Sequence, residues 1–106
     1  MTLSRELLHY RYFSNQLEDD SFEYLLFKTI RLVVGAEVTV YELKKLRAGM
    51  ETEVSRYKTY EQLMTELGKR QQGLSHYDYI LVSSVDISDH VNKQVLEPTK
   101  TRNIEI

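Results

Sequence analysis

The chain of 106 residues contains no cysteine and no tryptophan, one proline and four glycines. Without cysteine it has no disulfide, zinc-thiolate site, iron–sulfur cluster or thiol catalysis, and a cytoplasmic location is the simplest expectation. No stretch approaches the roughly 18 consecutive apolar residues of a membrane span, and Met1 is not followed by an export signal. We therefore expect a protein that is neither exported nor embedded in a membrane.

A strong charge of one sign is also missing, because the formal net charge is −2. This balance gives no general attraction to nucleic-acid phosphates and is far from the acidity of a protein that imitates DNA. Apolar residues at 42% and charged residues at 28% lie near the averages of globular domains. We expect one globular domain over residues 1–98, followed by a C-terminal tail or added edge strand over 99–106.

The clearest β-strand pattern is Tyr77–Val85, which is rich in aromatic and β-branched residues. A single strand cannot satisfy its own backbone N–H and C=O groups, so another strand has to pair with it. Two partners are open at this point: a second copy of the chain in a homodimer, or the alternating tail residues Ile104 and Ile106 in a short sheet.

Most of the remaining chain has apolar residues at helical spacing, which predicts helices over 3–17, 22–31, 40–46 and 60–73, with shorter ones at 51–58 and 86–95. Capping boxes begin at Asp20, Thr39 and Thr59. Residues 29–41 also fit a β-hairpin around Gly35, and both interpretations stay open. The sequence thus predicts an α+β fold: a small, predominantly helical domain with four to five helices and a small sheet built around 77–85.

The predicted core combines these helices with the strand. It consists of Leu25, Leu26, Ile30, Leu63, Leu67, Ile80 and Val82.

Residues 39–57 loosely resemble a helix-turn-helix, with a turn at Gly49. Five basic residues there would face DNA: Lys44, Lys45, Arg47, Arg56 and Lys58. The register does not favour the motif, because Lys45 stands where two helices would cross and a small residue is needed. Three glutamates also offset much of the positive charge. A DNA-binding transcriptional regulator is therefore the alternative function.

Signals of catalysis or metal binding are weak. His76 and Asp78, and the group Asp86, Asp89 and His90, lack the spacing of a known ligand motif. Ser83 and Ser84 have no nucleophile elbow around them, and the four glycines are scattered along the chain. We predict a protein that is not an enzyme and that uses no cofactor and no metal.

The eight tyrosines suit a recognition surface, because a tyrosine ring buries apolar area while its hydroxyl stays in water. Tyr77 and Tyr79 share a strand face with Leu81, and these three residues are the predicted partner-binding site. The predicted function is that of a small, non-enzymatic regulatory or inhibitory protein that binds another macromolecule. The expected partner is another protein, or a second copy of the chain; nucleic acid is the weaker alternative, and a membrane is not expected.

Overall fold

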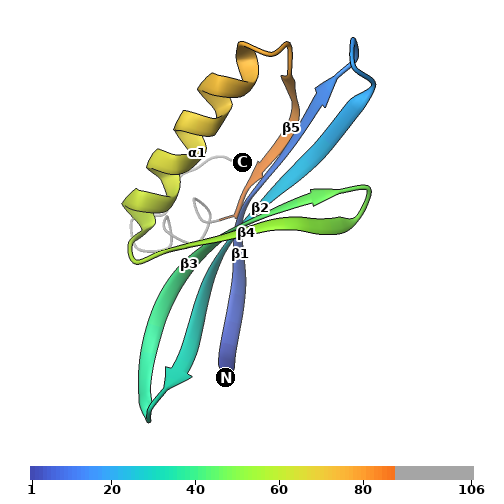
Figure 1. Cartoon of the computed structure of the whole chain (residues 1–106). Helices are drawn as coiled ribbons and strands as arrows, with labels where there is room; N and C mark the ends of the chain where they lie inside the picture. The colour runs from blue at the N-terminus through green and yellow to red at the C-terminus, as the bar shows by residue number, and fades with distance from the viewer. Residues whose placement is uncertain (88–106) are drawn as a thin grey trace, which may run out of the picture.

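The computed structural model describes residues 1–87, and this part of the chain forms an antiparallel sheet with one helix (Figure 1). The elements in chain order are β1 (Thr2–Asn15), β2 (Asp20–Val33), β3 (Ala36–Arg47), β4 (Met50–Tyr57), α1 (Tyr60–Ser75) and β5 (Ile80–Asp86).

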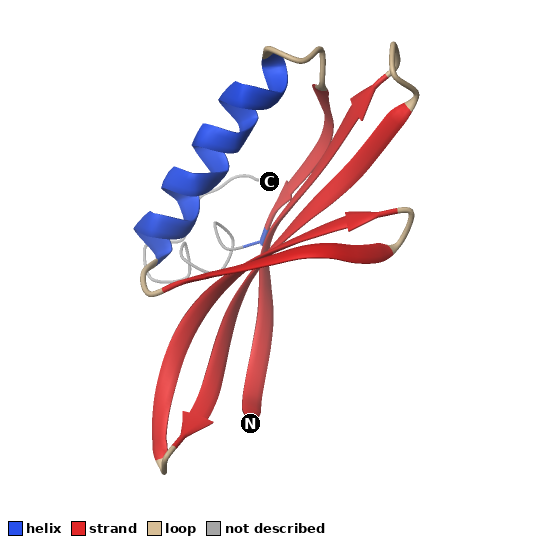
Figure 2. Cartoon of the chain, viewed as in Figure 1, coloured by secondary structure: helices blue, strands red, loops and turns tan. Residues whose placement is uncertain are grey.

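The sheet has the strand order β4-β3-β2-β1-β5, so β4 and β5 form its two edges. Neighbouring strands are antiparallel throughout. Helix α1 connects the two edge strands and lies over one face of the sheet (Figure 2). The first half of β1, the second half of β2 and the first half of β3 extend beyond the helix as an arm (Figure 1). No helix within residues 1–87 has the length and apolarity to cross a membrane.

The predicted helical α+β fold is wrong, because strands make up 63% of the described structure and only one helix is present there. The predicted helices at 3–17, 22–31, 40–46 and 51–58 coincide with strands β1 to β4. In β2, Phe22, Tyr24 and Leu26 alternate toward the helix, and Leu25 and Phe27 are half-buried on the other face. Because both faces carry apolar residues, the strand also satisfies the spacing of a helix.

Gly35 and Gly49 each form part of a tight hairpin turn. Val34 and Gly35 lie between the paired residues Val33 and Ala36, with φ angles of 50° and 78°. Ala48 and Gly49 connect β3 to β4 in the same way, with φ angles of 55° and 79°. Positive φ at both central residues is the backbone of a type I′ turn, whose twist matches that of the flanking strands. The hairpin interpretation of residues 29–41 is therefore the correct one.

The core lies between α1 and the covered face of the sheet. Phe13, Phe22 and Tyr24 pack with ring centroids 5.3 to 5.8 Å apart. Leu63 and Leu67 from α1 are 0% and 2% exposed and belong to the same buried cluster, which they cover on the helix side. Each such side chain contributes roughly 1.5 to 3 kcal/mol by leaving water. The buried cluster comprises Phe13, Phe22, Tyr24, Leu26, Leu43, Leu63 and Leu67.

The core prediction is confirmed for Leu26, Leu63 and Leu67. It is wrong for Ile80 and Val82, whose side chains are 57% and 52% exposed. These two residues belong to an edge strand over which no second layer lies in the described structure. Leu25 and Ile30 are half-buried.

The capping box at Thr59 is confirmed. The Thr59 hydroxyl accepts a hydrogen bond from the Gln62 backbone N–H at 3.1 Å, and the Gln62 side chain accepts one from the Thr59 N–H at 3.3 Å. Helix α1 starts at the next residue and ends at Ser75, two residues beyond the predicted end at Gly73. The boxes at Asp20 and Thr39 do not start helices, because both residues lie in strands. A capping box alone therefore does not distinguish a helix start from a strand.

The face of the sheet opposite α1 contains a buried ion cluster. Glu42 is 1% exposed, and its carboxylate accepts hydrogen bonds from the Thr29 hydroxyl at 2.8 Å and from Arg56 at 2.9 Å. Arg5 lies 3.3 Å away. Burial by itself raises the pKa of Glu42, but the hydrogen bonds from Thr29 and Arg56 and the charges of Arg5 and Arg56 hold it below its ordinary value. The cluster thus joins strands β1 to β4 across this face.

Three predictions concern residues beyond the described range. The helix at 86–95 falls there apart from its first two residues, and Asp86 is the last residue of β5. The tail 99–106 and the proposed pairing of Ile104 and Ile106 lie outside the described residues.

Candidate interaction edge

Strand β5 forms one edge of the sheet and carries the predicted interaction segment. The strand prediction for 77–85 is confirmed from Ile80 onward. On its inner side β5 pairs with β1, from Ser14 opposite Ile80 to His9 opposite Asp86. The neighbour left open by the sequence is therefore β1, and the second side of β5 is unpaired within residues 1–87.

The side chains of β5 make this edge unusual. All seven residues are exposed. The exposed fractions are 57% for Ile80, 43% for Leu81, 52% for Val82 and 50% for Val85. No charged residue occurs before Asp86 at the end of the strand. Natural edge strands are usually protected by lysine, proline or a covering element, and an apolar, uncharged edge favours pairing with another strand.

Hydrogen bonds hold the approach to β5 in place at its N-terminal end. The side-chain amide of Asn15 donates to the Tyr77 carbonyl at 2.8 Å. The Tyr79 hydroxyl donates to Asp20, which also receives two hydrogen bonds from Arg47, at 3.0 and 2.9 Å. The hydrogen bonds from Arg47 and Tyr79 hold the pKa of Asp20 below its ordinary value. The carboxylate is therefore charged at neutral pH and keeps both partners.

A second set of hydrogen bonds fixes the C-terminal end of β5. Asp86 lies 2.8 Å from His9 Nδ1 and 2.7 Å from Arg11. Burial raises the pKa of Asp86, but the hydrogen bonds from His9 and Arg11 lower it by more than burial raises it, so the net shift is downward. The other ring nitrogen of His9 lies 2.7 Å from the Tyr60 hydroxyl. With both ends fixed, β5 is presented as a rigid edge.

Asp86, His9 and Tyr60 bring a carboxylate, an imidazole and a hydroxyl into hydrogen-bond distance of one another in that order, which is the connectivity of a catalytic triad. His9 is only 3% exposed, however, and from β1 it contacts residues of two other elements, Asp86 of β5 and Tyr60 of α1. A structural role in joining these elements accounts for the geometry. Sequence reasoning did not bring His9 and Tyr60 together, because a separation of 51 residues carries no local signal.

The three predicted partner-binding residues differ in their surroundings. Tyr77 is 73% exposed and Leu81 is 43% exposed. Tyr79 packs against the core, with its ring centroid 5.3 Å from that of Phe22. Tyr77 and Leu81 thus remain available at the edge, and Tyr79 anchors the segment that leads into it.

The residues of the predicted helix-turn-helix form the hairpin of β3 and β4 instead. The two helices that the DNA-binding alternative needs are absent from this stretch, and alternation along the strands separates its basic residues. Lys45 lies over the Phe22 ring in the core, at 4.4 Å, and burial together with the charge of Arg47 lowers its pKa. Lys44 faces the opposite side, 3.4 Å from Glu51. Arg47 pairs with Asp20, Arg56 pairs with Glu42, and Lys58 is exposed in the loop before α1.

Among the metal-binding candidates, Asp86 is engaged by His9 and Arg11, and His76 and Asp78 are exposed. Asp89 and His90 lie outside the described residues. Within residues 1–87, no group of three or more histidine, aspartate or glutamate side chains is placed to hold a metal ion.

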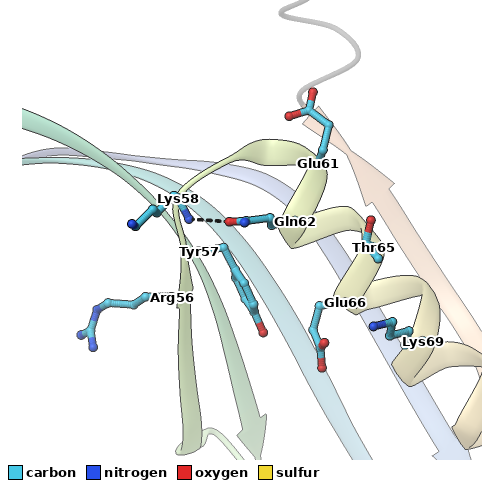
Figure 3. Close-up of a pocket in the computed structure, with 8 residues that line it drawn as sticks. All are labelled: Arg56, Tyr57, Lys58, Glu61, Gln62, Thr65, Glu66 and Lys69. Atoms are coloured by element: carbon cyan, nitrogen blue, oxygen red, sulfur yellow. Dashed lines mark hydrogen bonds between the residues drawn. The ribbon is translucent and has the colours of Figure 1, made fainter.

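A groove of about 560 Å³ runs between the opposite edge, β4, and helix α1 (Figure 3). The Tyr57 ring points toward the helix, and the Gln62 side chain accepts a hydrogen bond from the Lys58 backbone N–H at 3.0 Å. The lining mixes both signs of charge and comprises Arg56, Tyr57, Lys58, Glu61, Gln62, Thr65, Glu66 and Lys69. A groove lined by charged residues of both signs shows no preference for one ligand charge.

Comparisons of the chain with family models, with curated proteins and with solved structures found no match.

Proposed function

We propose that this chain is a non-enzymatic protein-binding domain, and that the outer edge of β5 receives a strand of another protein. The observation that carries the proposal is made within residues 1–87, where one short edge strand combines an unpaired outer backbone with four apolar, exposed side chains. Strand addition combines backbone hydrogen bonds, which provide affinity, with side-chain contacts, which provide specificity.

The rigidity of the edge supports this proposal. Because the hydrogen bonds at Tyr77 and Asp86 hold both ends of β5, little conformational entropy is lost when a partner strand pairs with it. Tyr77 and Leu81 supply the exposed aromatic and aliphatic contacts beside the added strand. A cytoplasmic location belongs to the same proposal and rests on the absence of cysteine.

The proposal is confined to binding. The regulatory or inhibitory role expected from the sequence has no structural observation to support it.

A lysine placed in β5 tests the proposal, because a charged side chain on an edge opposes strand addition. Val82 is suited to this change because the register between β1 and β5 shifts there. Tyr12 pairs with Ser83 and Phe13 with Leu81, so Val82 has no partner residue in β1 that the substitution would disturb. Met50→Lys is the matched control, since Met50 is a 72% exposed apolar residue at the start of the other edge strand.

The tagged full-length chain is cross-linked in the cells that naturally produce it, and the protein joined to β5 is identified, purified and titrated by calorimetry. We expect Val82→Lys to weaken binding by about tenfold or more. The affinity of Met50→Lys should stay close to that of the wild type, and both variants should keep nearly the wild-type melting temperature. Equal affinity of the wild type and Val82→Lys would refute the proposal. Cross-linking through β5 to a second copy alone would also refute it and would identify a homodimer.

A further inference from the structure

The face of the sheet opposite α1 has no second layer over it within residues 1–87 (Figure 2). An antiparallel sheet with one face in water normally carries polar side chains on that face. The centre of this face is instead apolar and aromatic, and its side chains are only half-buried by their neighbours on the sheet. An apolar surface of this kind marks an interaction site. The central side chains are Leu7, Tyr10, Leu25, Phe27, Leu46 and Val54.

Most charged residues on this face are neutralised by one another. Lys44 lies 3.4 Å from Glu51, and the carboxylate of Glu42 is paired with both Arg5 and Arg56. With these pairs made, the face lacks, among the described residues, the row of free cations that a nucleic-acid backbone requires. The occupant that this face favours is therefore a protein.

Two charged residues of β2 are left without an ionic partner, one toward each end of the face. Arg31 makes no hydrogen bond or ion pair within residues 1–87, and its Nε is buried without an acceptor. Glu23 accepts a hydrogen bond from the Tyr10 hydroxyl but forms no ion pair in the same part of the chain. A buried donor without an acceptor costs free energy, so Arg31 points to a group outside the described residues.

Glu23 and Arg31 are placed symmetrically on β2. Each lies four residues from Phe27, and alternation along the strand turns all three side chains away from α1. A two-fold axis that crosses the strands at Phe27 would lay β2 of one copy antiparallel over β2 of another. The same axis would bring Arg31 of each copy over Glu23 of the other, as an isologous interface requires.

We propose that a second copy of the chain covers this face, with Arg31 of each copy paired to Glu23 of the other. The contact does not include the outer edge of β5, so it is independent of the proposed function and leaves that edge open in both copies.

The extent of the face is sufficient for such a dimer. Strands lie about 4.8 Å apart and rise about 3.3 Å per residue, so five strands over about seven residues present roughly 550 Å². Two copies together bury about 1,100 Å², which is just above the size of about 1,000 Å² that a specific interface needs. A dimer of this size dissociates on dilution, and the chain is then a monomer.

Sedimentation equilibrium of the full-length chain between about 1 and 500 µM tests the proposal, and we expect a reversible monomer–dimer equilibrium. Arg31→Glu and Glu23→Arg each place like charges opposite one another and should weaken the dimer by about tenfold or more. The double variant exchanges the two charges and should return to within about threefold of the wild type. Lys28→Glu is the matched control, because it makes the same charge change on β2 but on the helix side, and it should leave the dimer unchanged.

Circular dichroism of the dilute variants shows whether each one stays folded, and recovery in the double variant separates a lost contact from a lost fold. A monomer at every concentration would overturn the proposal in favour of residues 88–106 or another protein on this face. A dimer that withstands both single substitutions, or a double variant that does not recover, would also overturn it. Loss of the dimer in Val82→Lys would place the contact at the β5 edge instead.

Discussion

Leu63→Ala should destabilise the protein strongly, because Leu63 is 0% exposed and connects α1 to the sheet. The substitution removes three buried carbons at about 0.8 kcal/mol each, or about 2.4 kcal/mol of transfer free energy. A cavity remains beneath the helix and raises the expected loss to about 3 to 4 kcal/mol. For a domain of this size that loss lowers the melting temperature by about 10 °C or more.

Urea unfolding followed by circular dichroism measures this loss directly. The control is Thr65→Ala, which changes an exposed residue of the same helix and should stay within about 0.5 kcal/mol of the wild type. A loss below about 1 kcal/mol for Leu63→Ala would refute the packing of α1 on the sheet and would mean that the helix binds something else.

The remaining predictions concern the polar clusters and tyrosines. The pKa of Glu42 is lowered on folding, so its stabilisation is present above about pH 4.5 and is lost as the pH falls through the folded pKa. Urea titrations at several pH values should show that Glu42→Gln lowers the free energy of unfolding by about 1 to 3 kcal/mol at neutral pH. The stability of this variant should also fall less than that of the wild type as the pH is lowered. Tyr77→Ser should lower the free energy of unfolding by less than about 0.5 kcal/mol. Tyr79→Ser should lower it by about 2 kcal/mol or more, because it removes the ring contact with Phe22 and the hydrogen bond to Asp20. Equal losses for the two variants would contradict the burial of Tyr79 and the exposure of Tyr77. Ultraviolet titration should find one tyrosine with a pKa of about 12, absent in Tyr10→Phe, because its hydrogen bond to Glu23 and its burial raise the pKa.

The sequence predicted local features better than the fold. The cap at Thr59, the burial of Leu63 and Leu67 and the strand after Tyr79 were all found, because each depends on neighbouring residues. The fold was missed because β1 to β3 are long strands with apolar residues on both faces, which obscures the period of two.

The interaction edge was partly predictable from the sequence. The tyrosine-rich strand indicated it, but its neighbour β1 lies more than 60 residues earlier, and no local pattern reveals such pairing. The hairpin at Gly35 was one of two open interpretations for a related reason: residues 29–41 fit either pattern locally, and only the backbone angles and the strand pairing distinguish them.

Amide hydrogen exchange in the purified, monomeric full-length chain tests the open edge most directly. In an antiparallel edge strand, about every second N–H points away from the sheet. We predict that these outward amides of β5 exchange nearly as fast as in an unfolded chain and that those of β2, which is paired on both sides, exchange slowly. Slow exchange of every β5 amide in the monomer would mean that the chain covers this edge itself, and it would contradict the account.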